Sequence, residues 1–243
     1  MREIEKYKII GIIQARMGSK RLPKKMSYYL GDYPIIDWVI QRSKKSELIQ
    51  KCVLATSTKA ENDYLIERAN KYSIDNFRGS EDNVLSRFVE IVNKENADVI
   101  VRICADNPFI DPDEIDRLLE NFLIDKPDYA FNHIPAMGNN YVDGFGAEIF
   151  SSKVLNIISK KATTLSHFEH VTKYIWDNQN EFEIISINAP KELSFPGYKF
   201  DIDTKDDLNM MIRLVENGIS ITTDAKKIIE ISNSLNIFHS FSF

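Results

Sequence analysis

The first half of the chain alternates short, strongly apolar runs with longer amphipathic segments, and this alternation constrains the fold more than any other feature. Lys8–Gln14, Cys52–Ser57 and Asp98–Cys104 are continuous apolar runs rich in β-branched residues. Runs of this kind predict strands that are buried on both faces of a sheet. A shorter strand is predicted at Ile74–Arg78.

Helices are predicted between these strands. Pro34–Lys45 places apolar residues on one face, Ala60–Tyr72 follows the second strand, and Ser80 is expected to cap a helix that runs to Glu95. Asp111, which precedes a proline and two acidic residues, is expected to cap the next helix. Strands that alternate with helices in this way predict parallel βαβ units with right-handed crossovers.

The alternation is less regular after Tyr129. Phe131–Phe150 holds glycine, asparagine and aromatic residues, which are typical of a loop or hairpin over a site. Beyond it we expect a helix over Leu165–Asn178, a strand over Phe182–Ile187, and a last short strand over Tyr198–Asp203 that leads into a helix capped by Thr204. Without a convincing linker, residues 1–243 are expected to form a single domain.

The charge balance argues against nucleic acid as the partner. Lys and Arg number 31 and Asp and Glu 36, a net charge of −5, whereas a nucleic-acid binder needs a basic excess. No stretch approaches the ~20 apolar residues that span a bilayer, and the first residues lack the apolar segment of a secretory signal. Cys52 and Cys104 lie in apolar runs and are expected to be reduced. Together these features predict a cytoplasmic protein that binds small molecules and no membrane.

A basic loop directly follows the first predicted strand and is the strongest candidate for a ligand-binding segment. Ser19 and nearby backbone N–H groups can donate to phosphate oxygens, and Arg16, Arg21 and Lys25 can neutralise phosphate charge. Gly18 permits backbone conformations that other residues avoid. An ordinary solvated surface loop is the alternative. The loop is neither a Walker loop nor a dinucleotide-binding fingerprint, because the required glycine and lysine spacings are absent.

Acidic residues follow two later predicted strands. Asp106 lies just beyond the strand that ends at Cys104, at the edge of the sheet where parallel α/β proteins bind ligands. Asp201 and Asp203 lie on the same face of an extended segment, and such a pair repels unless it is well solvated or a cation lies between. Magnesium takes one or two carboxylates together with substrate phosphates. Alternatively, Asp106 forms a turn with the asparagine and proline that follow it.

Three segments carry a resemblance to a known family. Gln14–Lys25, with the pattern Gln-Ala-Arg-x-x-Ser-x-Arg-Leu-Pro-x-Lys, resembles the signature loop of the cytidylyltransferases that activate sialic acid and 3-deoxy-octulosonate, and of the related SpsF-like group. Ala105–Pro108 and Asp201–Thr204 resemble their acidic motifs. The resemblance covers essentially the whole chain. It implies a Rossmann-like three-layer α/β/α nucleotide-diphospho-sugar transferase fold with a mostly parallel central sheet. One departure is Lys24, where many members have glycine.

The resemblance implies a chemistry and its cofactor. We expect transfer of CMP from CTP, with release of pyrophosphate, to a phosphorylated sugar, polyol or amino acid derivative or to a 2-keto acid sugar, in surface polysaccharide synthesis. The second half could carry an acceptor-binding or dimerisation arm, so a homodimer is plausible. The alternatives are an enzyme that uses UTP or GTP, a glycosyltransferase, and a non-catalytic nucleotide-binding protein of the same fold.

The resemblance also assigns roles to individual residues, and no covalent intermediate is required. The expected catalytic residues are Arg16, Arg21, Lys25 and Asp106. The expected ligands of Mg²⁺ are Asp106, Asp201 and Asp203. The expected nucleotide-binding residues are Gln14, Ala15, Gly18, Ser19, Ser57, Arg78, Ser80, Asn83 and Ala105. The expected acceptor-binding residues are His133, Tyr141, Asp143, Glu148, His170 and Lys173.

Overall fold

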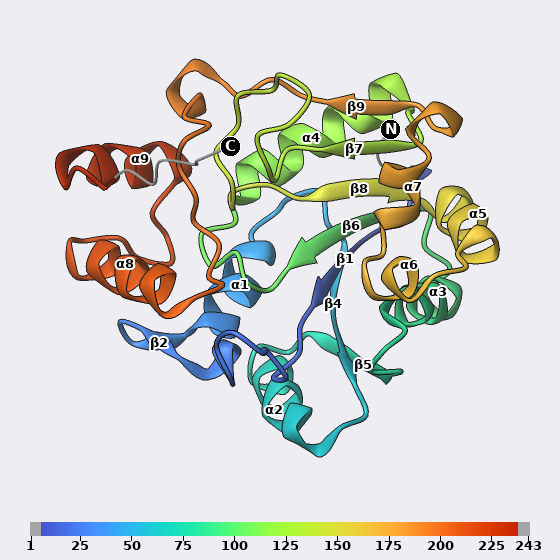
Figure 1. Ribbon diagram of the computed structural model, residues 1–243, viewed down its shortest axis with the longest axis horizontal. Coiled ribbons are helices and arrows are strands. Elements are labelled where there is room, and N and C mark those ends of the chain that lie inside the picture. The colour runs from blue at the N-terminus through green and yellow to red at the C-terminus, as the bar shows by residue number, and fades with distance from the viewer. Residues whose placement is uncertain (1–5, 238–243) are drawn as a thin grey trace.

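A central sheet organises the computed structural model, which describes residues 6–237 (Figure 1). Within that range the sheet has seven strands in the order β5-β4-β1-β6-β8-β7-β9. They are β1 (Ile9–Gln14), β4 (Lys51–Ser57), β5 (Asp75–Gly79), β6 (Val99–Cys104), β7 (Tyr129–Phe131), β8 (Glu148–Ser151) and β9 (Ile184–Ser186). The strands β5, β4, β1 and β6 are parallel, β8 is antiparallel to both of its neighbours, and β9 is parallel to β7. The mostly parallel sheet that the sequence predicts is confirmed.

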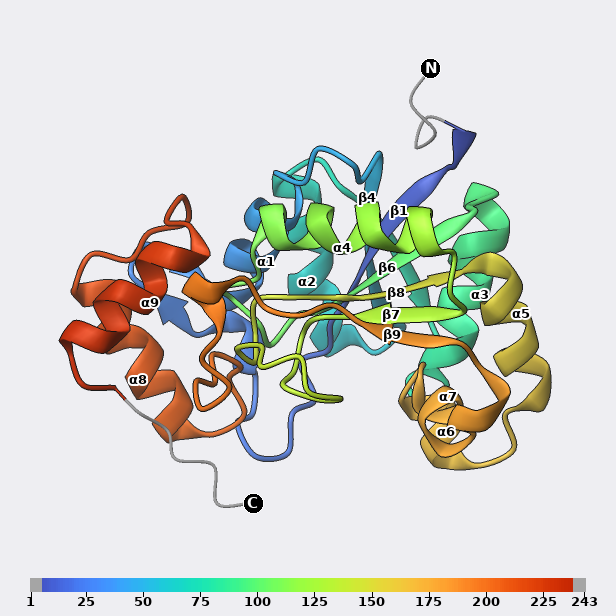
Figure 2. The ribbon, with the colours of Figure 1, turned by 90° about the horizontal axis from the view of Figure 1, so that it is seen from above.

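Helices cover both faces of the sheet, which gives the three predicted layers (Figure 2). One face carries α1 (Ile35–Ser43), α2 (Asp63–Lys71) and α4 (Pro112–Asp125). The other carries α3 (Val84–Glu95), α5 (Ser152–Lys161), α6 (Leu165–Glu169) and α7 (Lys173–Asp177). The helices α8 (Lys205–Glu216) and α9 (Ala225–Ser234) lie together at one end of the molecule (Figure 1). The short elements are a hairpin of β2 (Tyr29–Leu30) and β3 (Tyr33–Pro34), and the 3₁₀ turns η2 (Lys25–Ser27), η3 (Ala60–Asn62), η4 (Gln179–Glu181) and η5 (Lys191–Leu193).

The strand β1 shows why the central runs are apolar throughout. Ile9 and Ile13 belong to the hydrophobic cluster on the α1 and α4 side, whereas Ile10 and Ile12 belong to the cluster on the α3 and α5 side. All four side chains have no exposed surface. Since a strand side chain of this size contributes about 1.5–3 kcal/mol when it is buried, both faces stabilise the sheet. Within residues 6–237, every helix falls short of the length and apolarity that a membrane span needs.

Two elements predicted in the second half are wrong. The continuous helix over Leu165–Asn178 is two short helices, because His170 leaves the helical conformation (φ −110°, ψ 95°) between α6 and α7. The segment Tyr198–Asp203 is not a strand of the sheet, and its bridge between Lys199 and Asp143 lies outside the named strands. The backbone hydrogen bonds of this segment go to residues outside the strands, and the amide of Ile202 donates to the carbonyl of Asp106 (2.9 Å). The segment therefore crosses the end of β6 instead of extending the sheet.

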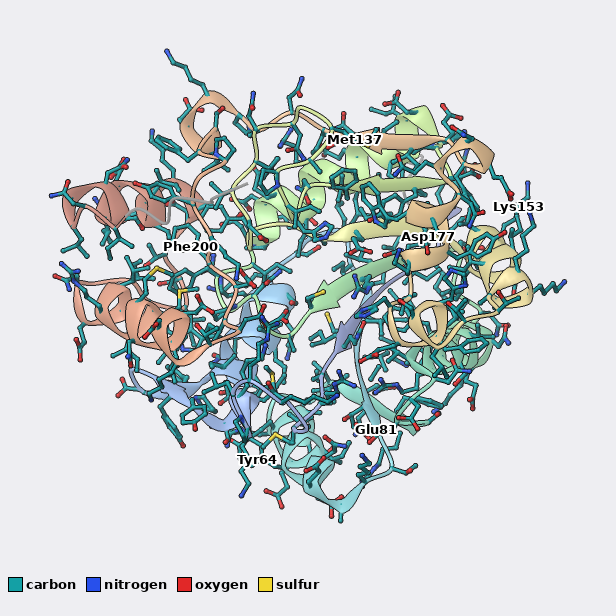
Figure 3. All side chains as sticks on the ribbon, in the orientation of Figure 1. Tyr64, Glu81, Met137, Lys153, Asp177 and Phe200 are labelled. Atoms are coloured by element: carbon teal, nitrogen blue, oxygen red, sulfur yellow. The ribbon has the colours of Figure 1, made fainter. Side chains whose placement is uncertain are left out.

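An aromatic cluster anchors this crossing segment. The ring of Phe200, labelled in Figure 3 on the side of the sheet toward α8, lies 5.8 Å from that of Phe109 and 5.1 Å from that of Phe145. Gly144 has φ +106°, and a Cβ there would lie 3.0 Å from the carbonyl carbon of Phe200. Only glycine accepts both constraints without strain. The cluster therefore fixes the residues that follow Phe200, which include Asp201 and Asp203.

The predicted helix starts are mostly confirmed. Asp111 caps α4 by accepting from two backbone amides, and Thr204 forms a capping box with Asp207 at the start of α8. The prediction that Ser80 caps α3 is wrong. Asn83 is the cap, with its side-chain oxygen 2.8 Å from the amide of Ser86, and the hydroxyl of Ser80 instead accepts from the amide of Asn83 (3.0 Å).

Candidate active site

A cleft of about 370 Å³ lies at the carboxyl ends of β1 and β6. The residues that line it are Gln14, Ala15, Arg16, Ser19, Lys20, Arg21, Lys25, Met26, Arg87, Arg102, Cys104, Ala105, Asp106, Glu169, His170 and Asp203. Six of these are Lys or Arg and three are Asp or Glu, although the chain as a whole has a net charge of −5. A positive excess confined to one cleft indicates an anionic ligand.

The basic loop is held in place from the end of β4. The side chain of Asn62 accepts from the amide of Met17 (2.9 Å) and donates to the hydroxyl of Ser57 (2.7 Å). Ser57 is fully buried, so the structure places it behind the loop and not in the cleft. Lys24 adopts the left-handed conformation (φ 56°) that glycine enters freely, which accounts for the glycine of the family pattern at this position.

Gly18 does not have the role that its residue type suggests. Its backbone φ lies outside the left-handed region, and a Cβ there would approach the Oε1 atom of Glu61 to 3.1 Å. Neighbouring side chains therefore restrict this position, and the unusual conformation in the loop belongs to Lys24. Gly18 is not among the residues that line the cleft.

Lys25 joins the basic loop to both acidic segments. Its side chain is buried, with 9% exposed, and its Nζ donates to the carbonyl of Ile202 (2.5 Å). The same Nζ lies 3.4 Å from Asp106 Oδ2 and 3.3 Å from Asp203 Oδ1. Arg21 pairs with the other oxygen of Asp203 (2.9 Å). The structure thus brings together loop cations and carboxylates that are far apart in the sequence.

The predicted Mg²⁺ ligands can be tested on this arrangement. Within residues 6–237, no group of three or more His, Cys, Asp or Glu side chains is placed to hold a metal ion. Asp106 and Asp203 nevertheless face one shared position, which the Lys25 ammonium occupies, so both carboxylates already stabilise a cation there. Two carboxylate oxygens with substrate phosphates make the donor set that magnesium prefers. Asp106 and Asp203 therefore fit a magnesium ion, and the binding of Mg²⁺ at this position stays a prediction.

Asp201 is placed differently from Asp203. It does not line the cleft, and its Oδ1 lies 3.0 Å from the ammonium of Lys199. That ammonium is also 4.0 Å from Asp203 Oδ2, so a lysine supplies the cation that two neighbouring carboxylates require. Burial, opposed in part by Lys199, raises the pKa of Asp201 to about 6. Burial and the charge of Asp201 raise the pKa of Asp143 to about 8.

Replacement of Asp143 by asparagine should change how stability depends on pH. Because the pKa of Asp143 is about 8 in the folded chain and 3.8 ordinarily, the folded state holds an extra proton between these values. The contribution of Asp143 to the free energy of unfolding therefore falls as the pH rises from about 4 to about 8. Asparagine cannot ionise, so the Tm of Asp143→Asn relative to wild type should rise from pH 5 to pH 8 in EDTA. The exposed Asp32→Asn serves as control, and a pH-independent difference would contradict the prediction.

Three predicted acceptor residues lie behind the cleft wall. His133 Nε2 is 3.1 Å from Glu148 Oε1, and Glu148 also pairs with Arg102, which lines the cleft and donates from Nε to Gln14 (3.1 Å). Burial lowers the pKa of His133, which favours the neutral ring. Tyr141 is fully buried, and its hydroxyl accepts from Arg117 (2.6 Å). His133 and Glu148 can act on a ligand only by positioning Arg102, and Tyr141 contacts Arg117, which does not line the cleft.

Of the other predicted acceptor residues, only His170 reaches the cleft. It lies next to Glu169, whose Oε1 is 2.8 Å from Arg16 Nη2. Lys173 instead forms an ion pair with Asp177 on the same helix. Asp143 is held beside Lys199 in the crossing segment. The last residue of α6 thus contributes a carboxylate to the site, and the residue that follows it contributes a histidine.

Three of the predicted nucleotide-binding residues, Arg78, Ser80 and Asn83, are not part of the cleft wall. Asn83 caps α3, and the hydroxyl of Ser80 accepts from the amide of Asn83. Arg78 is directed to the start of α2, where it donates to the carbonyls of Ser57 (3.1 Å) and Lys59 (2.8 Å) and pairs with Asp63 (2.5 Å). The sequence places Arg78 correctly at the end of a strand, but these competing acceptors hold its guanidinium away from the cleft.

Replacement of Arg78 by methionine should therefore affect stability more than ligand binding. Loss of its hydrogen bonds to backbone carbonyls should lower the free energy of unfolding by about 1–2 kcal/mol. The affinity for CTP should stay within about twofold of wild type, since an interaction absent from the site cannot contribute to ligand binding. Denaturant unfolding and calorimetric titration measure the two quantities. A tenfold loss of affinity for CTP at unchanged stability would show that Arg78 does contribute to nucleotide binding.

Several lining residues were not predicted from the sequence: Lys20, Met26, Arg87, Arg102 and Cys104. Burial raises the pKa of the Cys104 thiol to about 12, so it is not a thiolate at neutral pH and is unsuited to nucleophilic attack. The sequence carries a signal that could have identified Arg87 and Arg102. Each is a charged residue at a position where the helix or strand pattern predicts an apolar side chain.

Comparisons with known proteins agree with this geometry. A family model described as cytidylyltransferase matches residues 10–238. The chain is 36% identical over 223 residues to an uncharacterized protein of Methanocaldococcus jannaschii, covering 92% of this chain and 89% of that one. It is 34% identical over 215 residues to the spore coat polysaccharide biosynthesis protein SpsF of Bacillus subtilis, covering 86% and 87%. A solved cytidylyltransferase structure from Leptospira borgpetersenii superposes with a TM-score of 0.88 at 26% identity, covering 98% of each chain.

Proposed function

This chain belongs to the cytidylyltransferase family, and from that premise we propose that it transfers CMP from CTP to a small polar acceptor and releases pyrophosphate. The observation that carries the proposal is the meeting of Arg21 and Lys25 with Asp106 and Asp203 across one cleft. Cations can bind a triphosphate there while carboxylates face the same point. A non-catalytic protein that only binds nucleotides has no need of carboxylates at that point.

The proposed reaction is a single in-line displacement. An oxygen of the acceptor attacks the α-phosphorus, the bond from that phosphorus to the β-phosphate oxygen breaks, and pyrophosphate leaves with the electron pair. A hydroxyl acceptor also gives up its proton, whereas a phosphate acceptor attacks as the anion. Positioning and charge stabilisation carry most catalysis of this type, which requires no enzyme nucleophile.

The residues of the cleft take distinct parts in this reaction. Arg16, Arg21 and Lys25 bind the β- and γ-phosphates and stabilise the charge of the departing pyrophosphate. Ser19, Gln14 and the backbone at Ala15 and Ala105 border the same space. Mg²⁺, held by Asp106 and Asp203 beside Asp201, would neutralise charge on the α-phosphate when it is bound.

The acceptor is proposed to be a phosphorylated sugar, polyol or amino acid derivative, which gives a CDP-linked product. The printed name of the SpsF relative supports a role in surface polysaccharide synthesis. Lys20 supplies positive charge for such an acceptor, and His170 offers a ring nitrogen that can donate to one of its oxygens. A 2-keto acid sugar, which would give a CMP-linked product, is the second candidate because the family includes enzymes of that chemistry. A cytoplasmic location and a homodimer belong to the same proposal.

A pyrophosphate-release screen tests the proposal. CTP, UTP, GTP and ATP are each incubated with Mg²⁺ and with a panel of phosphorylated and 2-keto acid acceptors. We expect release only with CTP and with one acceptor class, and a matching rise in Tm with CTP, because a ligand that binds the folded state stabilises it. Faster release with UTP or GTP would contradict the choice of base. Binding of a nucleotide-sugar without any pyrophosphate release would indicate a glycosyltransferase instead.

A further inference from the structure

Arg87 is a buried cation of the cleft for which the protein supplies no complete set of partners. It lies on the buried face of α3, is 1% exposed, and lines the cleft. Its Nε and Nη1 atoms are buried and have no hydrogen-bond partner. Buried guanidinium groups are normally paired, because removal of an unpaired charge from water is costly. Burial lowers the pKa of Arg87 to about 10, as expected for a charge that is not compensated.

The charges around Arg87 do not neutralise it. Glu81, labelled in Figure 3, attracts the guanidinium, but it also pairs with Lys59 at 3.7 Å. Arg16 repels it, and the carboxylate beside Arg16 is already bound, because Glu169 pairs with Arg16 at 2.8 Å. Among residues 6–237, Arg16 thus has an ion-pair partner, whereas Arg87 lies near a second guanidinium and forms no ion pair of its own.

The direction of the Arg87 side chain is fixed by packing at the end of β5. A Cβ on Gly79 would approach Arg87 Cγ to 2.8 Å and Phe77 Cε1 to 2.9 Å, so the stem of Arg87 occupies the space that a larger residue would need. A stem confined in this way loses little freedom when the guanidinium binds a ligand. Side chains that are preorganised gain affinity because the entropy of ordering is not lost on binding.

We propose that Arg87 is a further binding residue of this cleft, and that its guanidinium binds an oxyanion, a phosphate or carboxylate group, beside Arg16. The proposal rests on the proposed function in taking this group to belong to the nucleotide or to the acceptor. Charge-assisted hydrogen bonds from a guanidinium to phosphate or carboxylate oxygens are the strong kind in proteins. One bound oxyanion would provide acceptors for the unpartnered donors and also reduce the repulsion between the two arginines.

The experiment compares Arg87→Met, which removes the charge but keeps the apolar stem, with Arg87→Lys and with the control Lys94→Gln. Lys94 is an exposed cation on the same helix, outside the cleft. Calorimetry measures the affinity of each protein for CTP, for cytidine, for inorganic phosphate alone, and for inorganic phosphate in the presence of saturating CTP. The Tm without ligand is measured in parallel.

We expect Arg87→Met to lose at least tenfold in affinity for an oxyanion while its Tm stays equal to or above that of wild type. Stability should not fall, because the substitution removes a buried charge that lacks partners. Arg87→Lys should lose less, and Lys94→Gln should match wild type. A loss for CTP but not for cytidine assigns the oxyanion to the nucleotide. A loss confined to phosphate in the presence of CTP assigns it to the acceptor.

Two results with a stable Arg87→Met would overturn the inference. One is wild-type affinity of Arg87→Met for every phosphate-bearing probe, and the other is an equal loss for cytidine, which carries no oxyanion. If Arg87→Met is unstable, the same comparison is made between Arg87→Lys and wild type, and equal affinities overturn the inference. A wild-type protein that binds no CTP would contradict the proposed function, and the arm with phosphate alone would then decide the role of Arg87.

Discussion

Replacement of Asp106 by asparagine should lower kcat/KM for CTP by about a hundredfold to a thousandfold, the size of effect seen when one preorganised electrostatic contact is removed from an active site. The amide has the shape of the carboxylate but no negative charge, so it cannot neutralise the Lys25 ammonium 3.4 Å away. It is also a poor ligand for magnesium. Pyrophosphate release at saturating Mg²⁺ measures the rate.

The fold should survive this substitution, which separates a catalytic defect from an unfolded protein. The side chain of Asp106 is 35% exposed, and its backbone carbonyl, which accepts from Ile202, is unchanged. The Tm should therefore stay within about 2 °C of wild type, as for most surface substitutions. Asp206→Asn is the matched control, since Asp206 is exposed in the first turn of α8 and does not line the cleft. Wild-type turnover in Asp106→Asn would remove this residue from the mechanism.

The sequence was most informative where the chain forms long buried strands. β1, β4 and β6 have six or seven residues each, and their β-branched runs are buried on both faces, which leaves an unambiguous pattern. β7 and β9 have only three residues each, too few to show any periodicity. The helix Ser152–Lys161 was not predicted, although it follows β8 directly. Tyr198–Asp203 has the composition of a strand, but tertiary contacts direct its backbone across the sheet end.

The site likewise contains some residues that the sequence predicts and others that it does not. Lys25 and Asp106 are predicted because each lies in a polar segment that follows an apolar run, and Asp203 because it shares one face of an extended segment with Asp201. The sequence gives the position of a side chain along the chain but not its direction, which competing partners decide. Arg78 was therefore expected in the cleft although it is bound to backbone carbonyls elsewhere. The sequence does not predict Arg87, because a single charge within an amphipathic helix differs from the exposed charges only by its position on the buried face.

Away from the cleft, a second buried arginine connects elements that are distant in the sequence. Arg42 of α1 is 2% exposed and donates to the backbone carbonyls of Ile110 (2.6 Å), Ile221 (3.0 Å) and Thr223 (2.7 Å). It also lies 3.3 Å from Asp111, which in turn accepts from the amide of Ala225 at the start of α9 (2.9 Å). A single guanidinium thus holds α1, the start of α4 and the segment before α9 together.

Replacement of Arg42 by methionine should destabilise the protein by about 3–5 kcal/mol, because it leaves a buried carboxylate and buried carbonyls without their donor. Burial already raises the pKa of Asp111, and loss of Arg42 removes the charge that opposes this rise. Asp111 should then fold in its protonated form, so the deficit of the variant should grow as the pH rises from 5 to 8. Denaturant unfolding measures the change, with the exposed Arg213→Met expected to stay within about 0.5 kcal/mol of wild type. A loss for Arg42→Met no larger than that of Arg213→Met would mean that the protein does not depend on this connection.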